Sequence, residues 1–188
     1  MLLLHIYLFS GLVIHKVIWE VLRLRSGIAP RGSTGSARLT AVKLVKIGIF
    51  LGILVQIWLP DQFPISNEPF MIRSIGIALF SLGLMTAIAA RIQLGDNWSN
   101  IESAKVLVDH AVVDKGIYNY VRHPIYTGDL LLLIGLELAL NSWLVIGALA
   151  LCPIVMWKAI KEEKMLLRKL AGYVEYHERT KRFIPFLI

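Results

Sequence analysis

Residues 122–128, Arg-His-Pro-Ile-Tyr-Thr-Gly, bring a cation, an imidazole and a phenol to the start of a long apolar stretch. Ionisable groups at a membrane boundary are costly unless they are paired or hydrated, and they often mark a functional cavity. A plainer reading is a helix that begins at Pro124, with Arg122 and Tyr126 at the level of the lipid headgroups. His123 and Gly128 favour a binding site, because a glycine permits another group to approach the backbone closely.

A second polar segment lies just upstream and reads His-Ala-Val-Val-Asp-Lys-Gly-Ile-Tyr over residues 110–118. Gly116 and Tyr118 suit a simple turn with an aromatic anchor. They also suit a bend that brings a ligand against the backbone, and the segment alone leaves both readings open. We interpret the two polar segments as the parts of one composite site.

The composition predicts an integral membrane protein. The mean hydropathy is +0.65, hydrophobic residues make up 56% of the 188 residues, and charged residues only 18%. The mean hydropathy and the hydrophobic content are too high for an ordinary soluble domain of this size. The single cysteine, Cys152, rules out a disulfide framework. The opening Met1-Leu2-Leu3-Leu4 lacks a basic region and predicts a retained helix instead of a signal peptide.

We expect one all-α domain over residues 1–188, with about five transmembrane helices. The last two apolar segments are separated only by Asn141-Ser142 and predict a tight helical hairpin. The charged stretch 161–179 predicts an amphipathic helix on the membrane surface. The five apolar segments are 2–22, 42–60, 70–92, 126–140 and 143–160.

Lysine and arginine side chains surround these apolar segments instead of forming a separate basic domain. We therefore attribute the net charge of +7 to membrane topology and contacts with the bilayer, not to nucleic-acid binding. The basic residues gather between the first two segments, in the loop 91–125 and after the fifth segment. This distribution predicts an outside N-terminus, with the site on the cytoplasmic side of a prokaryotic inner membrane or an endoplasmic reticulum membrane.

Other polar residues leave two readings open. Lys158 and Glu162 are four apart, which suits a surface ion pair, although a carboxylate there could instead bind a ligand ammonium or sulfonium. Asp129 and Glu137 share a helix face, where they could be functional or pack against a basic neighbour. No metal, dinucleotide or phosphate-binding motif is present in the sequence, so we expect no metal.

Taken in order, the motifs of residues 94–187 resemble those of the isoprenylcysteine carboxyl methyltransferase family, within the wider group that includes phospholipid N-methyltransferases. The resemblance divides the chain into N-terminal transmembrane helices (1–93) and a methyltransferase-like core (94–188). Its motifs are Leu94 to Ser99, His110 to Tyr118, Arg122 to Gly128, Glu162-Glu163, and a tail from Tyr173 to Pro185.

The resemblance implies S-adenosylmethionine as methyl donor, a lipidic or prenylated acceptor, and roles for individual residues. Arg122 and His123 would organise the cofactor, and Glu162 would meet its methionine ammonium. Lys158 takes the position of the family's arginine for the substrate carboxylate, and as a point charge it cannot form a bidentate clamp. Asn97 and Trp98 would also lie on the substrate side. The expected cofactor pocket comprises His110, Ala111, Val112, Val113, Gly116, Tyr118, His123, Pro124, Ile125, Tyr126 and Glu162.

Methyl transfer from a sulfonium is an in-line displacement that mainly demands positioning and exclusion of water, so we assign no general base. Carboxyl methylation of a prenylated cysteine is the leading expectation, with phospholipid or small-molecule methylation as an alternative. A membrane sterol reductase using NADPH is a second alternative, but its related segment carries Asn where Ile125 stands. A non-catalytic membrane scaffold with this fold is a third.

Overall fold

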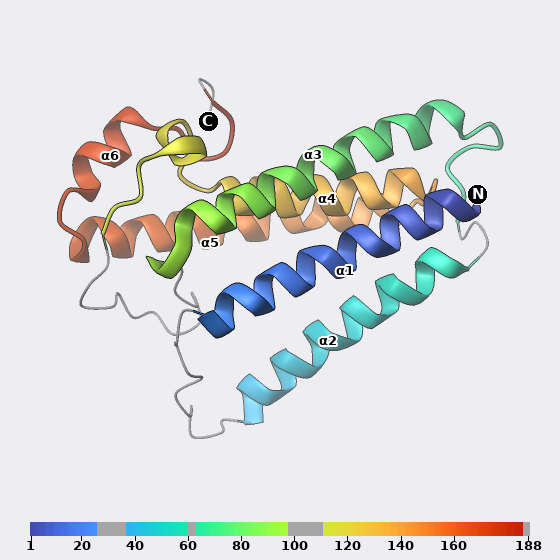
Figure 1. Cartoon of the computed structure of the whole chain (residues 1–188), viewed down its shortest axis with the longest axis horizontal. Helices are drawn as coiled ribbons and strands as arrows, with labels where there is room; N and C mark the ends of the chain where they lie inside the picture. Colours follow the sequence, from blue (N-terminus) through green and yellow to red (C-terminus); the bar gives the residue numbers. More distant parts are fainter. Residues whose placement is uncertain (26–36, 60–62, 98–110, 186–188) are drawn as a thin grey trace.

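The computed structural model describes residues 1–25, 37–59, 63–97 and 111–185, and the regular elements within these ranges are all helical (Figure 1). Two short 3-10 turns, η1 (Gly95–Asn97) and η3 (Gly116–Asn119), follow or precede the longer helices. The α-helices are α1 (Leu2–Arg25), α2 (Ala37–Trp58), α3 (Phe70–Leu94), α4 (Pro124–Ala139), α5 (Val145–Lys169) and α6 (Tyr173–Arg179).

The long helices run roughly alongside one another, and the polar elements collect at one end of the bundle. In Figure 1, α6, η3 and the C-terminal segment gather at the end where α3 finishes, while the N-terminus of α1 lies at the opposite end. The pair α3 and α4 forms the centre of the bundle, and α5 packs on α4. Helix α2 lies beside α1 on the outside. The site is therefore built on the ends of α3, α4 and α5.

Glycines spaced seven residues apart bring the backbones of α3 and α4 into contact. A spacing of seven is two helical turns, so each pair lies on one face of its helix. A Cβ added to Gly76 or Gly83 of α3 would lie 2.2 or 2.3 Å from a backbone nitrogen of α4. A Cβ on Gly128 or Gly135 of α4 would lie 2.5 or 2.2 Å from a backbone nitrogen of α3. Any side chain at one of these positions would push α3 and α4 apart. We call this contact, made by Gly76, Gly83, Gly128 and Gly135, the glycine seam. Small residues at helix contacts are typical of membrane helix packing.

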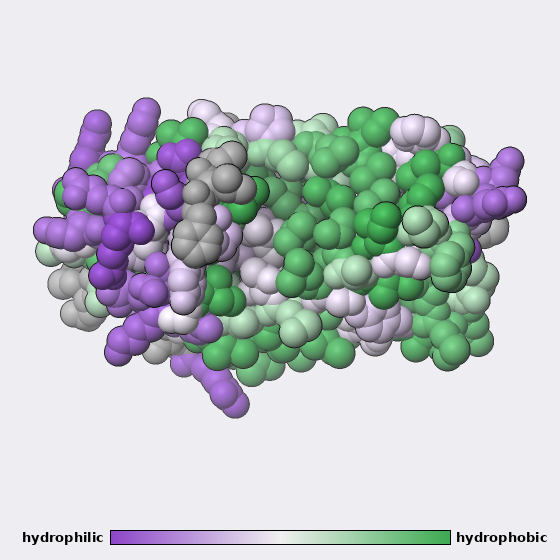
Figure 2. All heavy atoms as spheres, turned by 90° about the horizontal axis from the view of Figure 1, so that it is seen from above, coloured by the Kyte–Doolittle hydropathy of each residue, from purple (hydrophilic) through white to green (hydrophobic). Residues whose placement is uncertain are grey.

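A broad apolar surface covers the middle of the molecule between two polar ends, as Figure 2 shows. Two described helices, Leu2–Arg25 and Phe70–Leu94, are long and apolar enough to cross a membrane, and Leu44–Trp58 is a shorter apolar helix. Many large apolar side chains on α1, α3 and α5 face outward. An apolar exterior of this extent is suited to lipid, not water. The chain is a membrane protein.

The end of the bundle remote from α6 is closed by side-chain hydrogen bonds. Asn141, with φ of 56°, lies in the turn between α4 and α5. Its amide bonds both the carbonyl and the N–H of Ser66, at 2.8 and 3.1 Å. Glu137 is buried and accepts a hydrogen bond from Gln56 Nε2 at 2.8 Å. Its recorded partner is thus an amide of α2, whereas a basic neighbour was the expected alternative.

The C-terminal region differs from the single amphipathic helix expected over 161–179. Helix α5 continues to Lys169, so its last two turns extend beyond the apolar segment. Leu170 then adopts an extended conformation, and Gly172 has φ of 76°, a left-handed conformation that favours glycine. The chain reverses there and forms the short helix α6, whose Tyr173 and Tyr176 are buried. The amphipathic pattern reflects packing of α6 onto the site end of the bundle.

Candidate functional site

The segment before α4 pairs with the C-terminal segment of the chain. Residues Tyr120 to His123 lie beside residues 181 and 182, with one parallel β-bridge between Val121 and Lys181. The backbone N–H groups of Arg122 and His123 donate to the carbonyls of Lys181 and Arg182, at 2.8 and 3.0 Å. Pro124 then starts α4, where its missing N–H is harmless. The C-terminal tail therefore holds the backbone at the start of the polar heptapeptide.

Glu163 of α5 is the centre of a buried ionic cluster. Its residue exposure is only 2%. Arg122 Nε donates to its Oε1 at 2.9 Å, and Arg182 Nη2 donates to its Oε2 at 2.8 Å. His123 Nε2 lies 3.2 Å from Oε1, and His177 Nε2 lies 3.7 Å from Oε2. One carboxylate thus joins α5, the start of α4, α6 and the tail.

These contacts determine the protonation state of Glu163. Burial alone would raise the pKa of this carboxyl, because a low-dielectric environment disfavours the charged form. Hydrogen bonds from His123, Arg182 and Arg122 outweigh burial and hold the pKa of Glu163 well below its usual range. The cluster therefore contains a carboxylate anion at neutral pH.

Arg122 is engaged by this cluster. Besides Glu163, its Nη1 donates to the backbone carbonyl of His177 at 2.9 Å and to that of Thr180. Its side chain is buried. The sequence led us to expect Arg122 as a cofactor-organising group. The recorded contacts instead direct its guanidinium to α5, α6 and the tail, so its influence on a ligand would pass through the residues it positions.

His123 and Tyr126 form an aromatic pair that faces the other glutamate. The two rings are stacked, with centroids 5.4 Å apart, and Phe183 of the tail lies 5.8 Å from the imidazole. Tyr126 Oη donates to Glu162 Oε2 at 3.1 Å, and His123 Nδ1 lies 3.9 Å from the same oxygen. Side-chain exposure is 22% for Glu162 and 3% for Glu163. Glu162 is the carboxylate that retains room for a ligand.

Tyr118 contributes a buried phenol beside these residues. Its backbone carbonyl accepts a hydrogen bond from Tyr176 Oη at 2.9 Å, which ties η3 to α6. Burial, followed by the charges of Tyr176 and Glu162, raises the pKa of Tyr118 well above its usual value. The phenol therefore remains protonated and able to donate a hydrogen bond.

Two side chains, one in the last turn of α3 and one in η1, hold the polar segment 111–117 in place. Asn97 Oδ1 accepts from the N–H of Ala111 at 3.0 Å, and Gln93 Oε1 accepts from the N–H of Ile117 at 2.9 Å. Gly116 has φ of 61°, and a Cβ there would lie 2.4 Å from Gln93 Oε1. Gly116 thus makes a tight turn against Gln93, which both readings of the sequence allow, and Asn97 is bonded to the backbone of the proposed cofactor segment.

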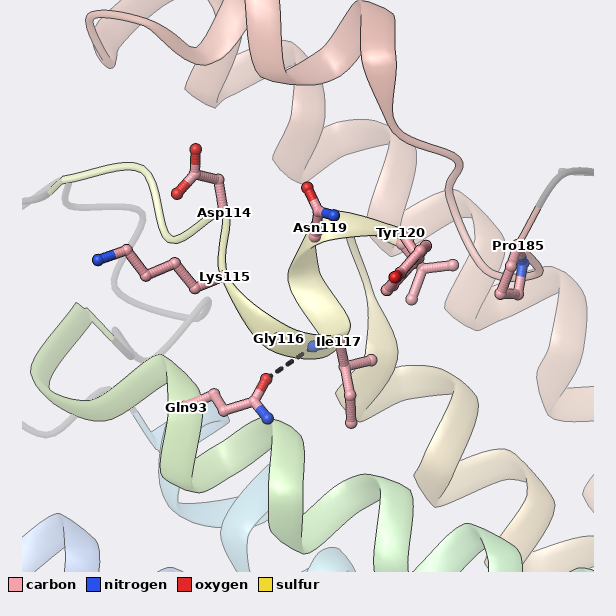
Figure 3. A pocket seen from close by; sticks show the side chains of 9 residues that line it. Gln93, Asp114, Lys115, Gly116, Ile117, Asn119, Tyr120 and Pro185 are labelled. Carbon is pink, nitrogen blue, oxygen red and sulfur yellow. Dashed lines mark hydrogen bonds between the residues drawn. The ribbon is translucent and has the colours of Figure 1, made fainter.

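A surface cavity of about 650 Å³ lies on the outer side of this bend. Figure 3 shows Gln93 and the η3 segment on one side and Pro185 of the tail on the other. Of the predicted cofactor residues that the structure describes, only Gly116 lines this cavity. Tyr126 and Glu162 are not among the residues that line this cavity.

The remaining predicted residues are placed as follows. Lys158 is half-buried on α5, one turn before Glu162, and the described residues record no ion pair between the two. Ala111 is exposed and Pro124 buried, while Val112, Val113 and Ile125 are half-buried. His110 and Trp98 lie outside the described residues.

Two buried charged residues were not foreseen as parts of this end of the bundle. From the sequence, we treated Glu163 only as the neighbour of Glu162. Adjacent residues of a helix point in different directions, and this was the sequence signal that the two glutamates would have different surroundings. Arg91 is one of the basic residues of 91–125 that we attributed to membrane topology from the sequence. It is 1% exposed at the end of α3 and donates to the carbonyl of Gly95 at 2.9 Å. A charged residue at an apolar boundary was the only sequence signal for it.

The fold and site together define a helical membrane protein with a polar, carboxylate-containing site at one end of its bundle. A family model described as phospholipid methyltransferase matches residues 71–172, more than half of the chain. The chain belongs to the phospholipid methyltransferase family. The match begins at α3 and therefore covers the glycine seam, the heptapeptide and both glutamates.

Known relatives agree with the resemblance to isoprenylcysteine carboxyl methyltransferases. The chain is 34% identical over 119 residues to a protein-S-isoprenylcysteine O-methyltransferase of Saccharomyces cerevisiae, covering 60% of this chain and 48% of that protein. It is 30% identical over 117 residues to the protein of that name from Schizosaccharomyces pombe, covering 59% and 48%. Protein-S-isoprenylcysteine O-methyltransferase B of Arabidopsis thaliana is 28% identical over 131 residues, covering 66% and 65%. The chain thus spans about half the length of the yeast relatives.

A solved structure of a eukaryotic intramembrane Ras methyltransferase, an isoprenylcysteine carboxyl methyltransferase, has the same fold. The TM-score is 0.58 at 21% identity, and the match covers 98% of this chain and 68% of the other. At this identity the likeness concerns the fold, and the sequence relatives carry the resemblance in function.

Proposed function

We propose that this protein is an S-adenosylmethionine-dependent methyltransferase that acts on a lipidic or prenylated acceptor in the membrane. The observation that carries the proposal is the Glu162 carboxylate, held by Tyr126 Oη at 3.1 Å beside the stacked His123 ring. This arrangement belongs to a chain of the phospholipid methyltransferase family with several relatives named as isoprenylcysteine O-methyltransferases.

The residues present are chemically suited to S-adenosylmethionine. Glu162 is an oriented and accessible carboxylate for the amino acid ammonium. His123, Tyr126 and Tyr118 supply aromatic surface and hydrogen-bonding groups for the remainder of the molecule. Asn97, just after the end of α3, holds the segment from Ala111 to Val113 through the N–H of Ala111. The backbone of this segment could form a further side of the cofactor pocket.

When bound, the cofactor supplies a methyl group on a positively charged sulfur. The residues of this chain then have three tasks: they hold the donor, orient the acceptor and exclude water. Glu163 and its arginine partners perform the first indirectly, since they fix His123 at the start of α4. Apolar side chains of the bundle keep bulk water from the reacting atoms. An ionised carboxylate acceptor needs no base.

The specific reaction we propose is methylation of the C-terminal carboxylate of a prenylated cysteine, on the cytoplasmic side of the membrane. The names of the relatives support this choice, and the apolar exterior suits lateral access of a prenyl chain. Lys158, one helical turn before Glu162, is the proposed cation for the acceptor carboxylate. A phospholipid amine is the second candidate, because a lysine provides a point charge and lacks the bidentate geometry of arginine.

Binding of S-adenosylhomocysteine, measured by calorimetry with the full chain in detergent, tests the donor site. We expect Tyr126→Phe to weaken binding roughly three- to tenfold, because one hydrogen bond to a charged partner is lost. Tyr120→Phe is the control, since Tyr120 is exposed and precedes the heptapeptide. A wild-type protein that binds no S-adenosylhomocysteine but is stabilised by NADPH would instead support the reductase alternative.

Transfer of a labelled methyl group from S-adenosylmethionine to a membrane extract tests the reaction. Base treatment of the product then separates the two acceptor classes. We expect label that base releases, because a methyl ester is hydrolysed. Base-stable label in the lipid fraction would identify an amine acceptor. No label in any fraction, despite cofactor binding, would count against the methyltransferase assignment.

A further inference from the structure

The cavity beside η3 is large enough for a ligand of its own. Its volume is about 650 Å³, and small-molecule sites usually measure about 300–1,000 Å³. Three apolar side chains contribute to its lining: Ile117 of η3, Val121 just after η3, and Pro185 of the tail. Since Tyr126 and Glu162 do not line this cavity, a molecule bound here would be distinct from the proposed methyl donor.

The cavity lies where the apolar surface of the molecule gives way to a polar end, a change that Figure 2 shows. Gln93, in the last turn of α3, lines the cavity, and α3 is long and apolar enough to cross a membrane. Its neighbour Ile92 is 57% exposed, so the outer face of α3 is still apolar at this level. Tyr120, another lining residue, is 53% exposed, and tyrosine is enriched where a membrane meets water. The cavity is therefore at the level of lipid headgroups.

The polar side chains of the cavity include three that can donate hydrogen bonds to an anion. Lys115 is exposed, and within the described part of the chain no partner is recorded for its ammonium. Asn119 and Tyr120 are exposed as well, and both line the cavity together with Lys115 (Figure 3). An ammonium, an amide N–H and a phenol O–H are all donors. The cavity thus offers one positive charge and two neutral donors.

The carboxylate at the cavity is already paired. Among the described lining residues, Asp114 alone has an acidic side chain. Arg179 Nη2 of α6 donates to Asp114 Oδ2, so the two charges form an ion pair. Because this pairing offsets the charge of Asp114, Lys115 gives the cavity a net positive charge. Charge complementarity therefore favours an anionic ligand.

A phospholipid with an anionic headgroup has each of the properties that this cavity selects. Its phosphodiester accepts several hydrogen bonds, and lysine commonly binds phosphate as a point charge. Its glycerol region and the first acyl carbons are suited to the apolar lining. It is also present at the depth at which the cavity lies. A soluble anion would satisfy Lys115 but would leave the apolar side chains without a partner.

A general attraction between basic residues and an anionic leaflet is the plainer alternative. Such an attraction adds to membrane affinity for each lysine near the surface and needs no defined site. Helix α5 carries exposed lysines of this kind, among them Lys161 and Lys164. Of the described lysines, Lys115 alone lines the cavity. The two alternatives therefore predict different effects for different lysines.

We propose that the cavity beside η3 binds the headgroup of an anionic phospholipid, with Lys115 on the phosphate. Asn119 and Tyr120 donate to the remaining headgroup oxygens, and the apolar lining contacts the glycerol region. The bound lipid touches η3 and the tail at once and so reinforces their contact. The inference goes beyond the proposed methyl transfer, because this lipid is a bound ligand and not the acceptor.

Thermal unfolding of the full chain in an uncharged maltoside detergent tests the proposal, with dioctanoyl-phosphatidylglycerol as the probe. A ligand that binds only the folded protein raises its stability, so the melting temperature should rise and then saturate. The same concentration of dioctanoyl-phosphatidylcholine should raise it less. We expect Lys115→Gln to increase the half-saturating concentration about fivefold, because the contact of one lysine with an anionic headgroup is lost. Lys115→Arg keeps the charge and should stay within about twofold of wild type.

Lys164→Gln is the matched control, because Lys164 is an exposed lysine that does not line the cavity. It should change the half-saturating concentration by less than about twofold, since distant surface charges are screened by salt. Asn119→Trp is a second variant at an exposed position of η3. Its larger side chain should fill part of the cavity and weaken the effect of the probe without removing a charge. Melting temperatures without the probe show whether each variant is folded.

The proposal fails if the probe leaves the melting temperature of wild type unchanged, or if both lipids act equally. Equal effects of Lys115→Gln and Lys164→Gln would indicate a general attraction of the basic surface for anionic lipid. Inorganic phosphate that stabilises the protein as well as the lipid does would make the cavity a site for a soluble anion. All these outcomes are independent of S-adenosylhomocysteine binding, so they leave the proposed methyl transfer to its own tests.

Discussion

Glu163 and Arg182 form a forked ion pair that joins α5 to the C-terminal segment. Arg182 Nη2 lies 2.8 Å from Glu163 Oε2, and Arg182 Nε lies 3.1 Å from both carboxylate oxygens. Paired hydrogen bonds of this kind add geometric specificity to charge attraction. Because the same carboxylate also accepts from Arg122, the pair determines where the tail meets the first turn of α4.

Replacement of the buried glutamate should destabilise the protein strongly. Glu163→Gln would leave Arg122 buried without its anion, and breaking a buried pair in this way costs about 3–5 kcal/mol. Glu162→Gln is the matched control on the adjacent residue, where the amide oxygen can still accept from Tyr126 and loss of the charge alone should cost no more than about 1 kcal/mol. Denaturant unfolding in detergent, followed by tryptophan fluorescence, measures both. Equal losses in the two variants would contradict the central role of Glu163.

Because the pKa of Glu163 is lowered in the folded protein, we expect the free energy of unfolding to fall in acid. Its folded-state pKa is lowered, so the unfolded chain, with a glutamate pKa of about 4.3, takes up the proton first as the pH falls. The contribution of Glu163 is therefore complete above about pH 5 and is lost as the pH falls below about 4. Unfolding free energies between pH 3 and pH 7 measure this effect.

Comparison with Glu163→Gln separates this contribution from those of the groups around the carboxylate, which are Arg122, Arg182, His123 and His177. The variant should show a flatter dependence between pH 3 and pH 5. Parallel curves for the two proteins would show that Glu163 is not responsible for the loss in acid.

The glycine seam predicts a large difference between two similar substitutions. A Cβ at Gly135 would lie 2.2 Å from the backbone nitrogen of Phe80, so Gly135→Ala must separate α3 from α4. Overpacking of this kind costs about 1–3 kcal/mol. Gly147 of α5 has no atom within 4 Å of an added Cβ, and Gly147→Ala should leave stability within about 0.5 kcal/mol of wild type. Thermal unfolding of both variants in the same detergent measures the difference in stability. Equal melting temperatures would show that α3 and α4 can separate at little cost in stability.

Apolar segments predict helices well, because a helix of about 20 apolar residues is suited to a membrane. A helix lies over most of each of the five segments, and α4 begins at Pro124 as expected, although only two of the described helices are long and apolar enough to cross a membrane. The seven-residue spacing of Gly76 with Gly83 and of Gly128 with Gly135 was visible too. Its meaning depends on which helix lies opposite, and that information is not local.

The sequence grouped the residue types of the candidate site, but the contacts that each of them makes depend on the fold. His123, Tyr126 and Glu162 lie together, whereas the ion pair between Lys158 and Glu162, one of the two readings that the sequence left open, is not found among the described residues. Glu163 and Glu162 are neighbours of identical chemistry, and only the position of the tail decides which of them is buried. The tail reaches the heptapeptide through backbone hydrogen bonds, which carry no side-chain signature.

Pairing of the tail with the heptapeptide also sets an order of events during biosynthesis. Helices α3 and α4 emerge from the ribosome well before Arg182, so their seam can close while the start of α4 still lacks its partners. The ionic cluster around Glu163 and the two backbone hydrogen bonds from Arg122 and His123 can form only after the tail has been translated. A nascent chain can therefore assemble its central helices first and the proposed binding site later, once α5, α6 and the tail are in place.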